Sequence, residues 1–243
     1  MPTSHSRSPL RANRYLRRPS AGANCVVVSV DYRLGPEQPY PAAVEDTVEA
    51  LQWVHSKGAD LLGINPARIA VGGSSRSVRP LPASLSSHAH SPGPHSGGNL
   101  AAVATHKAPA LGVPLVFQLL VVPVTDNTAA VGDTRYASWT ANARTVSLVP
   151  EKMLWFRRNY VPDEANWAKP DSSPIFAPDA SFAAAPPAWI AVAELDVLRD
   201  EGIAYGEKLK QAGVAVEVKV YKGAPHPIMA MDGRCSAASL DRC

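Results

Sequence analysis

Three side chains that could form a catalytic triad occur along the chain in the order serine, aspartate and histidine. Ser75 follows one predicted strand, Asp196 follows a second, and His226 follows a third. In a triad the serine attacks an acyl carbon, the histidine takes and returns the proton, and the aspartate orients the imidazole. The sequence therefore predicts Ser75 as nucleophile, Asp196 as acid and His226 as base.

Each of these residues also has an ordinary structural explanation. Ser75 alone is compatible with a turn serine, and His226 alone with a surface loop histidine. Asp200 and Glu201 compete with Asp196 for the acidic role, and one of these acids is expected to cap the helix that follows. The shared position at strand ends, where open α/β sheets place their sites, favours the triad.

The turn around Ser75 is divided into two pieces in the sequence. Residues 73–75 joined to residues 96–99 give Gly-Ser-Ser-Ser-Gly-Gly-Asn, a G-x-S-x-G motif between a strand and a helix. This motif holds the serine on a strained turn, and its small residues let strand and helix approach each other. The helix N-terminus then presents N–H groups to a developing oxyanion. The residues expected to form this elbow and oxyanion site are Gly73, Ser96, Gly97 and Gly98.

Residues 76–95 separate the two pieces of the motif. This segment has four prolines, five serines, three histidines and no acidic residue. Such a composition buries little apolar surface and predicts a low-complexity insert. A metal site at His88, His90 and His95 is the alternative, but nothing in their spacing fixes a coordination geometry. We therefore expect no metal site.

Strand and helix patterns alternate through the rest of the chain, which predicts βαβ units and a parallel sheet. Gly58 is expected to end the first helix, and Cys25 to be a buried free thiol. Residues 127–187 carry aromatic residues and prolines without a clear period, and they predict either a partial lid or a surface insertion. The predicted strands are 25–32, 68–71, 114–124, 189–193 and 214–221, and the predicted helices are 42–57, 100–106, 151–160 and 201–212.

Length and charge indicate one α/β domain at residues 25–233, flanked by an irregular basic segment at 1–24 and an irregular tail at 234–243. The net charge of +3 comes largely from five arginines in residues 1–24, so a nucleic-acid partner is not expected. No run approaches the roughly 18 apolar residues of a membrane span. The sequence does not indicate an oligomeric state.

The three cysteines form no C-x-x-C pair, which favours a reducing compartment and a cytoplasmic location. The arginine- and serine-rich start also permits a mitochondrial transit peptide as an alternative.

Several segments resemble the hormone-sensitive-lipase-like branch of the α/β-hydrolases. The resemblance implies an α/β-hydrolase fold, with a mainly parallel sheet and helices on both faces. It also implies a carboxylesterase or lipase-like enzyme that acts on small acyl esters through an acyl-enzyme, without a cofactor. The family's nucleophile, acid and base fall on Ser75, Asp196 and His226. The segments that carry the resemblance are residues 28–37, 41–46, 68–75, 97–102 and 196–202.

The sequence departs from this family at several points. Residues 1–24 lack the H-G-G-G loop that supplies most oxyanion N–H groups in the family, and the sheet is expected to be incomplete at both ends. Ser74 stands where an acid is usual, and Pro227 where a glycine commonly follows the histidine. We hypothesise that 76–95 is translated intron and that both ends are misread. The alternatives to an esterase are a catalytically inactive small-molecule binding protein and a chain that folds poorly.

Overall fold

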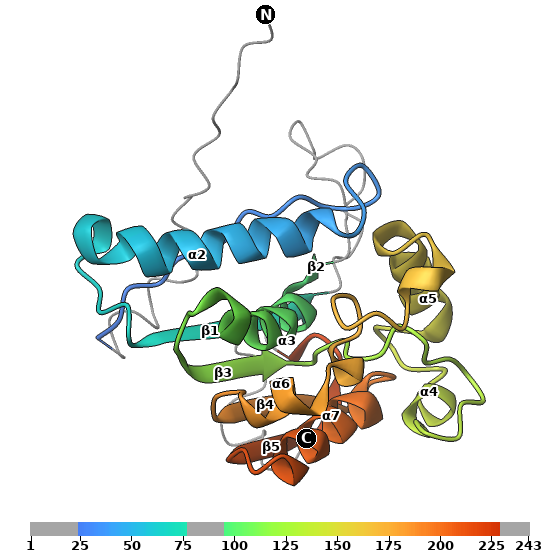
Figure 1. Ribbon diagram of the computed structural model, residues 1–243. Coiled ribbons are helices and arrows are strands. Elements are labelled where there is room, and N and C mark those ends of the chain that lie inside the picture. Colours follow the sequence, from blue (N-terminus) through green and yellow to red (C-terminus); the bar gives the residue numbers. More distant parts are fainter. Residues whose placement is uncertain (1–23, 77–94, 229–243) are drawn as a thin grey trace, which may run out of the picture.

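The computed structural model describes residues 24–76 and 95–228, which form a five-stranded sheet in the order β2-β1-β3-β4-β5 (Figure 1). The short strand β2 is antiparallel to β1, and the other strands run parallel to one another. The predicted parallel sheet is therefore confirmed. Most of the terminal segments and of the insert, for which irregular structure is predicted, lies outside the described residues. The strands are β1 (Ile69–Arg76), β2 (His95–Ser96), β3 (Leu115–Val121), β4 (Ala188–Leu195) and β5 (Val216–Pro225).

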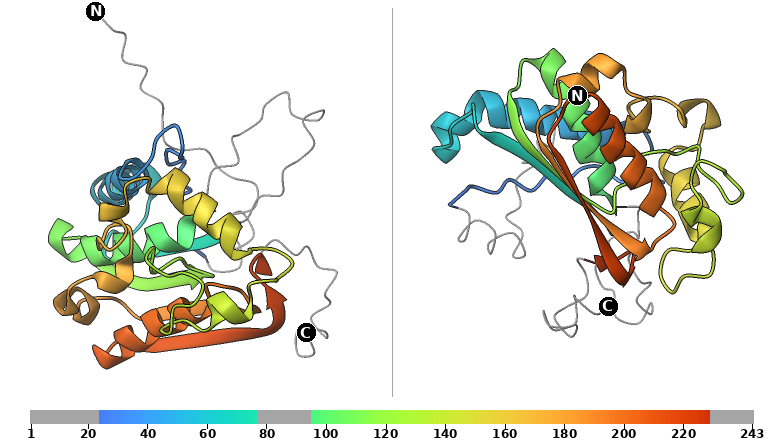
Figure 2. Two further views of the ribbon diagram at one scale, coloured as in Figure 1. Left: turned by 90° about the vertical axis from the view of Figure 1, so that its right-hand side faces the viewer. Right: turned by 90° about the horizontal axis from the view of Figure 1, so that it is seen from below.

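Three long helices pack with the sheet. Helix α3 (Gly97–Lys107) contacts β1 and β3, helix α7 (Arg199–Gln211) contacts β4 and β5, and helix α2 (Ala42–Leu62) packs on α3. Figure 2 shows α3 and α7 side by side along the same face of the sheet. The apolar core lies between these helices and the strands, and its fully buried members include Ala102, Leu120, Ile190, Tyr205 and Leu209.

The chain between β3 and β4 makes a long excursion of short elements. Helix α4 (Ser138–Ala141) and helix α5 (Pro150–Tyr160) lie beyond the carboxyl ends of the strands, on the right of Figure 1. The predicted helix at 151–160 corresponds to α5. Four one- or two-turn elements complete the described helices: η3 (Ala108–Leu111), η4 (Glu164–Asn166), η5 (Pro174–Phe176) and α6 (Asp179–Ala183).

The predicted strand at residues 25–32 is wrong. Within this range no strand forms, and Val30 alone makes a single β-bridge. The side chains of Val26 and Val27 are 52% and 37% exposed. The prediction that Cys25 is buried is also wrong, because its free thiol is exposed. An apolar run becomes a central strand only where neighbouring strands pair with it on both sides, and residues 25–32 do not join the five-stranded sheet.

The prediction that Gly58 ends the first helix is wrong. Helix α2 continues to Leu62 and ends at Gly63, which has φ of 66° and donates its N–H to the Ala59 carbonyl. A Cβ at Gly58 would lie 2.6 Å from the Ile64 Cδ1 atom, so this glycine makes room for a side chain inside the helix. The left-handed backbone at Gly63 is the actual stop.

A buried histidine joins α3 to α7. The His106 Nε2 atom lies 2.9 Å from the Tyr205 hydroxyl, and the His106 ring meets the Phe182 ring edge-on. Burial lowers the pKa of His106 to about 4, because the packed rings desolvate the imidazolium. The folded protein therefore contains His106 in its neutral form near neutral pH.

This burial predicts that acid weakens the fold through His106. The pKa of His106 is lower in the folded chain than in the unfolded chain, so protonation at low pH favours the unfolded chain. The contribution of His106 to the free energy of unfolding is therefore complete above about pH 6.5 and is lost as the pH falls toward 4. The total loss is on the order of 3 kcal/mol. Urea unfolding between these pH values should show a smaller pH dependence in His106→Leu than in the original chain. The same substitution at half-buried His55 is the control, and equal pH dependence in all three proteins would contradict the assignment.

Candidate active site

The three residues of the predicted triad lie at one edge of the sheet. Ser75 is near the end of β1, while Asp196 and His226 directly follow β4 and β5. Because β1, β3, β4 and β5 run parallel, their carboxyl ends meet at this edge. The structure thus brings together residues that are up to 151 positions apart in the chain.

The imidazole of His226 bridges the other two side chains. Its Nε2 atom lies 3.0 Å from the Ser75 Oγ, and its Nδ1 atom lies 2.7 Å from the Asp196 Oδ2. Asp196 and His226 are each 1% exposed, so both contacts are shielded from water. The second carboxylate oxygen of Asp196 accepts the backbone N–H of Leu198 at 3.1 Å, which fixes the orientation of the acid.

The competing acids have other partners. Asp200 accepts the backbone N–H of Ser138 at 2.7 Å, and Glu201 accepts N–H groups from Thr125 at 2.8 Å and from the Trp139 indole at 3.1 Å. The expectation that one acid caps the following helix is wrong, because α7 has no side-chain cap hydrogen bond. Burial raises the pKa of Glu201 to about 8. Of the three acids, Asp196 is the one that contacts His226.

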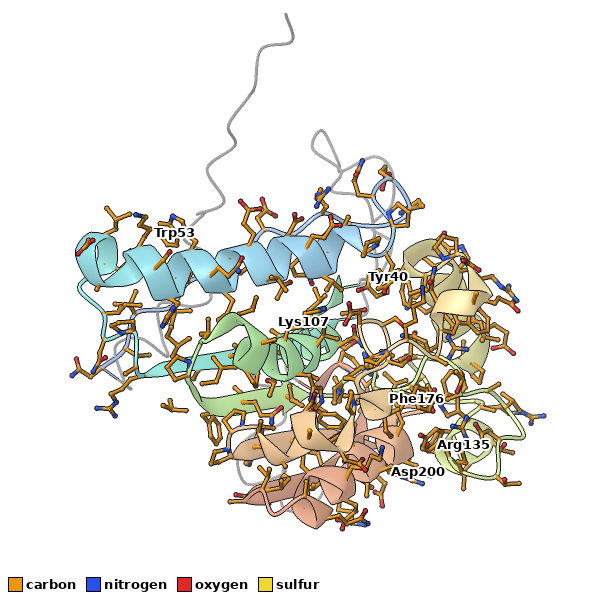
Figure 3. All side chains as sticks on the ribbon, viewed as in Figure 1. Tyr40, Trp53, Lys107, Arg135, Phe176 and Asp200 are labelled. Atoms are coloured by element: carbon orange, nitrogen blue, oxygen red, sulfur yellow. The ribbon has the colours of Figure 1, made fainter. Side chains whose placement is uncertain are left out.

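The loop that carries Asp196 is held by side chains of the excursion, which the sequence pattern did not single out. The Asn142 amide donates to the backbone carbonyls of Asp196 at 2.8 Å and Glu194 at 3.0 Å. Ser138 donates to the Val197 carbonyl at 2.7 Å, and Thr145 to the Leu195 carbonyl at 2.6 Å. Figure 3 shows Asp200 on α7, on the side of the molecule where the excursion lies. Polar residues after a short helix carry no distinctive sequence signal, so only the structure reveals this support.

The strand and the helix around Ser75 approach each other as the glycines predict. A Cβ at Gly73 would lie 1.9 Å from the Gly97 carbonyl oxygen, and a Cβ at Gly97 would lie 2.8 Å from the Ser74 carbonyl oxygen. A Cβ at Gly98 would lie 3.0 Å from the Cα of Pro123. Any larger residue at Gly73 would push β1 and α3 apart.

The strained turn expected at Ser75 is not present in the described residues. Ser75 lies within β1 and pairs with Ser96 of β2. Among the described residues, the non-glycine residues with positive φ are Asn24 and Val122, so the backbone of Ser75 is not strained in this way. The reason is the insert, because Arg76 continues β1 and α3 begins from the opposite strand of the pair. Ser96 nevertheless occupies the N-cap of α3, and because it pairs with Ser75, the first N–H groups of this helix lie next to the nucleophile. No side chain caps these N–H groups at Ser96.

A small cavity adjoins this helix start. Its volume is about 10 Å3, which is room for about one water molecule. The cavity lies between the beginning of α3 and helix α5, and none of Ser75, Asp196 and His226 lines it. Its lining consists of Ser96, Asn99, Val124, Asn127, Met153, Phe156, Arg157 and Tyr160.

A metal centre has no support in residues 24–76 and 95–228, where no group of three histidine, cysteine or acidic side chains is arranged to hold an ion. The alternative site at His88, His90 and His95 falls outside the described side chains. Within the same ranges, no helix is long and apolar enough to cross a membrane.

Comparison with known proteins identifies the family. A family model described as "alpha/beta hydrolase fold" matches residues 5–76 and 92–230, so the chain belongs to the α/β-hydrolases. The unmatched residues 77–91 lie inside the predicted insert, which confirms an insertion at this point. The match begins at residue 5 and so includes most of the segment at 1–24, which was predicted to lie outside the domain.

Curated relatives carry the names of α/β-hydrolases and carboxylesterases. An AB hydrolase superfamily protein of Schizosaccharomyces pombe is 49% identical over 213 residues, and the carboxylesterase NlhH of Mycobacterium tuberculosis is 39% identical over 204 residues. These alignments cover 86% and 83% of this chain. The chain spans 56% of the length of each relative.

Solved structures agree with this assignment. A thermostable esterase from Pseudomonas putida superimposes with a TM-score of 0.76 at 34% identity, covering 94% of this chain and 64% of that one. The thermophilic carboxylesterase EstE1, cloned from a metagenomic library, gives a TM-score of 0.75 at 35% identity, with coverage of 93% and 69%. The predicted fold class and the hydrolase family are therefore confirmed.

The contact between Gly73 and Gly97 predicts the effect of a single methyl group. Gly73→Ala should lower the free energy of unfolding by about 2–3 kcal/mol, because the added Cβ overlaps a backbone carbonyl that cannot move aside. Gly112→Ala is the matched control, since Gly112 has φ of 67° and open space around it, and only backbone strain of about 1 kcal/mol is expected. Urea denaturation measures both, and equal losses would contradict the proposed close contact.

Proposed function

We propose that this protein is a serine carboxylic-ester hydrolase that cleaves small acyl esters through an acyl-enzyme at Ser75. The observation that carries the proposal is the imidazole of His226, which reaches the Ser75 Oγ on one side and the Asp196 carboxylate on the other. The names of the relatives, carboxylesterase and esterase, support the same class of substrate.

In the proposed acylation, the His226 Nε2 atom accepts the Ser75 hydroxyl proton while the Oγ atom attacks the ester carbonyl carbon. Collapse of the tetrahedral intermediate breaks the bond to the alcohol oxygen, which takes the proton from His226. A water molecule then repeats the sequence on the acyl-enzyme and releases the acid. Asp196 accepts the Nδ1 hydrogen throughout, so it selects the imidazole tautomer and offsets the charge of the imidazolium.

The developing oxyanion requires N–H donors. The beginning of α3 offers such donors beside Ser75, and the positive end of the helix dipole adds to their effect. The insert separates Ser75 from Ser96, so the N–H that follows the nucleophile belongs to Arg76 and not to the helix start. Since one missing donor lowers kcat by about a hundred- to a thousandfold, we propose that this chain is a slow esterase.

A second candidate function is a small-molecule binding protein without catalysis. The observation that favours it is the position of Ser75 within a strand, where Arg76, and not the helix, follows it in the chain. The intact contacts among Ser75, Asp196 and His226 favour the esterase.

Hydrolysis of p-nitrophenyl butyrate tests the proposed function. Ser75→Ala should abolish turnover, because it removes the only atom that forms the acyl bond, while Ser74→Ala should retain activity within about threefold. Ser74 is a suitable control because its hydroxyl donates to the Ser75 carbonyl at 3.1 Å and does not contact His226. If the two variants hydrolyse the ester equally, the binding function replaces the esterase.

Removal of the insert gives an independent test. Ser75 and Ser96 are Cα partners in an antiparallel pair, where opposed Cα atoms lie about 4.5–5.5 Å apart, and a peptide bond needs about 3.8 Å. A chain without residues 76–95 can therefore join Ser75 to Ser96 with little movement, which restores the turn and brings the Ser96 N–H beside the nucleophile.

We expect this deletion to raise kcat/KM for p-nitrophenyl butyrate at least tenfold, because it supplies an oxyanion donor in the family's position. A deletion of residues 80–91 is the control, since it shortens the insert but leaves Ser75 and Ser96 unjoined. An equal rate in the full chain and both deletions would show that the insert does not limit catalysis.

A further inference from the structure

A bulge interrupts the pairing of β4 with β5 just before the triad histidine. Between two paired positions, β4 contains a single residue, Glu194, whereas β5 contains the three residues 222–224. Gly223, in the middle of the three, has φ of 66°, a left-handed backbone that glycine adopts readily. Bulges bend a strand and redirect the side chains that follow, so this one sets the direction from which His226 enters the site. The flanking pairs are Ala193 with Tyr221 and Leu195 with Pro225.

The carboxylate of Glu194 closes this bulge. Its Oε2 atom accepts the backbone N–H of Gly223 at 2.7 Å, and its Oε1 atom accepts from the Lys222 ammonium at 3.0 Å. The bond from Gly223, followed by the bond from Lys222, lowers the pKa of Glu194, so the carboxylate is ionised near neutral pH. Backbone N–H groups lose their ladder partners in a bulge, and here a charged acceptor replaces one of them.

The backbone of Glu194 is itself fixed by two other elements. Its carbonyl accepts from the Asn142 amide of the excursion at 3.0 Å and from the Arg199 guanidinium of α7 at 3.1 Å. The Asn142 amide also donates to the Asp196 carbonyl at 2.8 Å. Glu194 therefore connects the fixed loop of the acid to the strand that carries the base.

An ordinary surface ion pair is the other explanation for this carboxylate. The Lys222 side chain is 73% exposed, and ion pairs with so much contact to water stabilise a fold little. The bond to Gly223 differs because it fixes backbone, three residues before His226, at the shorter distance of 2.7 Å. The two contacts of Glu194 are therefore separable by substitution.

We infer that Glu194 is a positioning residue, which holds the bulge of β5 so that the His226 imidazole stays between Asp196 and Ser75. One ring must keep two contacts, 2.7 Å from Nδ1 to the Asp196 Oδ2 and 3.0 Å from Nε2 to the Ser75 Oγ. A shift of its backbone lengthens at least one of them, and misplacement by about 1 Å can slow a reaction about a hundredfold. This inference rests on the proposed esterase function for its effect on rate.

Three variants test the inference by hydrolysis of p-nitrophenyl butyrate. Glu194→Leu removes the acceptor and should lower kcat about tenfold with KM unchanged, because acylation and deacylation both use the imidazole and slow together. Glu194→Gln keeps an oxygen that accepts from Gly223 and should retain kcat within about threefold. Lys222→Met is the matched control, because it removes the ion pair alone, and it should hydrolyse the ester like the original chain. The Glu194 side chain is 35% exposed, so Glu194→Leu leaves no buried cavity and should fold.

Proton NMR of the full chain gives a second measurement, which needs no turnover. The proton between the His226 Nδ1 atom and the Asp196 carboxylate is shielded from water, so it should give a downfield resonance that exchanges slowly. Its absence in His226→Gln assigns this resonance. We expect Glu194→Gln and Lys222→Met to keep the resonance, and Glu194→Leu to broaden or lose it, because the imidazole no longer keeps one position.

The two measurements distinguish this inference from the proposed function. If the original chain hydrolyses no ester but Glu194→Leu alone loses the resonance, then the positioning role stands and the esterase fails. If the ester is hydrolysed and Glu194→Leu equals the original chain in kcat and in the resonance, then the esterase stands and the positioning role is overturned. Equal losses in Lys222→Met and Glu194→Leu also overturn it, because the ion pair and not the bond to Gly223 would then hold the bulge.

Discussion

The close contact between Gly73 of β1 and Gly97 of α3 is the constraint on which the site depends. Because a Cβ at Gly73 would overlap the Gly97 carbonyl, only glycine permits this distance between strand and helix. The contact places the N-terminus of α3 and its N-cap residue Ser96 beside Ser75. One backbone approach therefore positions both the nucleophile and the oxyanion donors, which explains how the site keeps its form although an insert separates its two halves in the chain.

A buried polar network extends this arrangement to the excursion. The Asp126 carboxylate accepts from Tyr136 at 3.0 Å and Arg135 at 2.9 Å, while Glu201 of α7 binds the backbone of Thr125. This network connects the end of β3 to α7 and to the residues around α4. Since Asn142 in turn holds the Asp196 loop, the orientation of the acid depends on side chains far from it in sequence. Such dense pairing at the carboxyl edge gives the triad a fixed geometry before any substrate binds.

Much of the fold and the triad follows from sequence because both rest on local patterns. The strands β1, β3, β4 and β5, and the residues at their ends, were predicted from apolar runs and from their spacing. The predictions for residues 25–32 and Gly58 failed because tertiary context decided them: the first needed neighbouring strands, and the second depended on the side chain of Ile64. The prediction of a turn at Ser75 was also wrong. The G-x-S-x-G pattern assumes that Ser75 is bonded directly to Ser96, but Arg76 follows Ser75 and extends β1. No sequence pattern marked Asn142, whose importance arises from its hydrogen bonds to the backbone of the Asp196 loop.

The sheet edge and the excursion contribute differently to the site. Ser75, Asp196 and His226 come from the ends of parallel strands, whose relative positions are fixed by the ladder of the sheet. The excursion contributes no strand to the described sheet, but its Ser138 and Asn142 hold the loop that carries Asp196. The order of the strands therefore brings the three residues together, while hydrogen bonds from the excursion fix the loop of the acid.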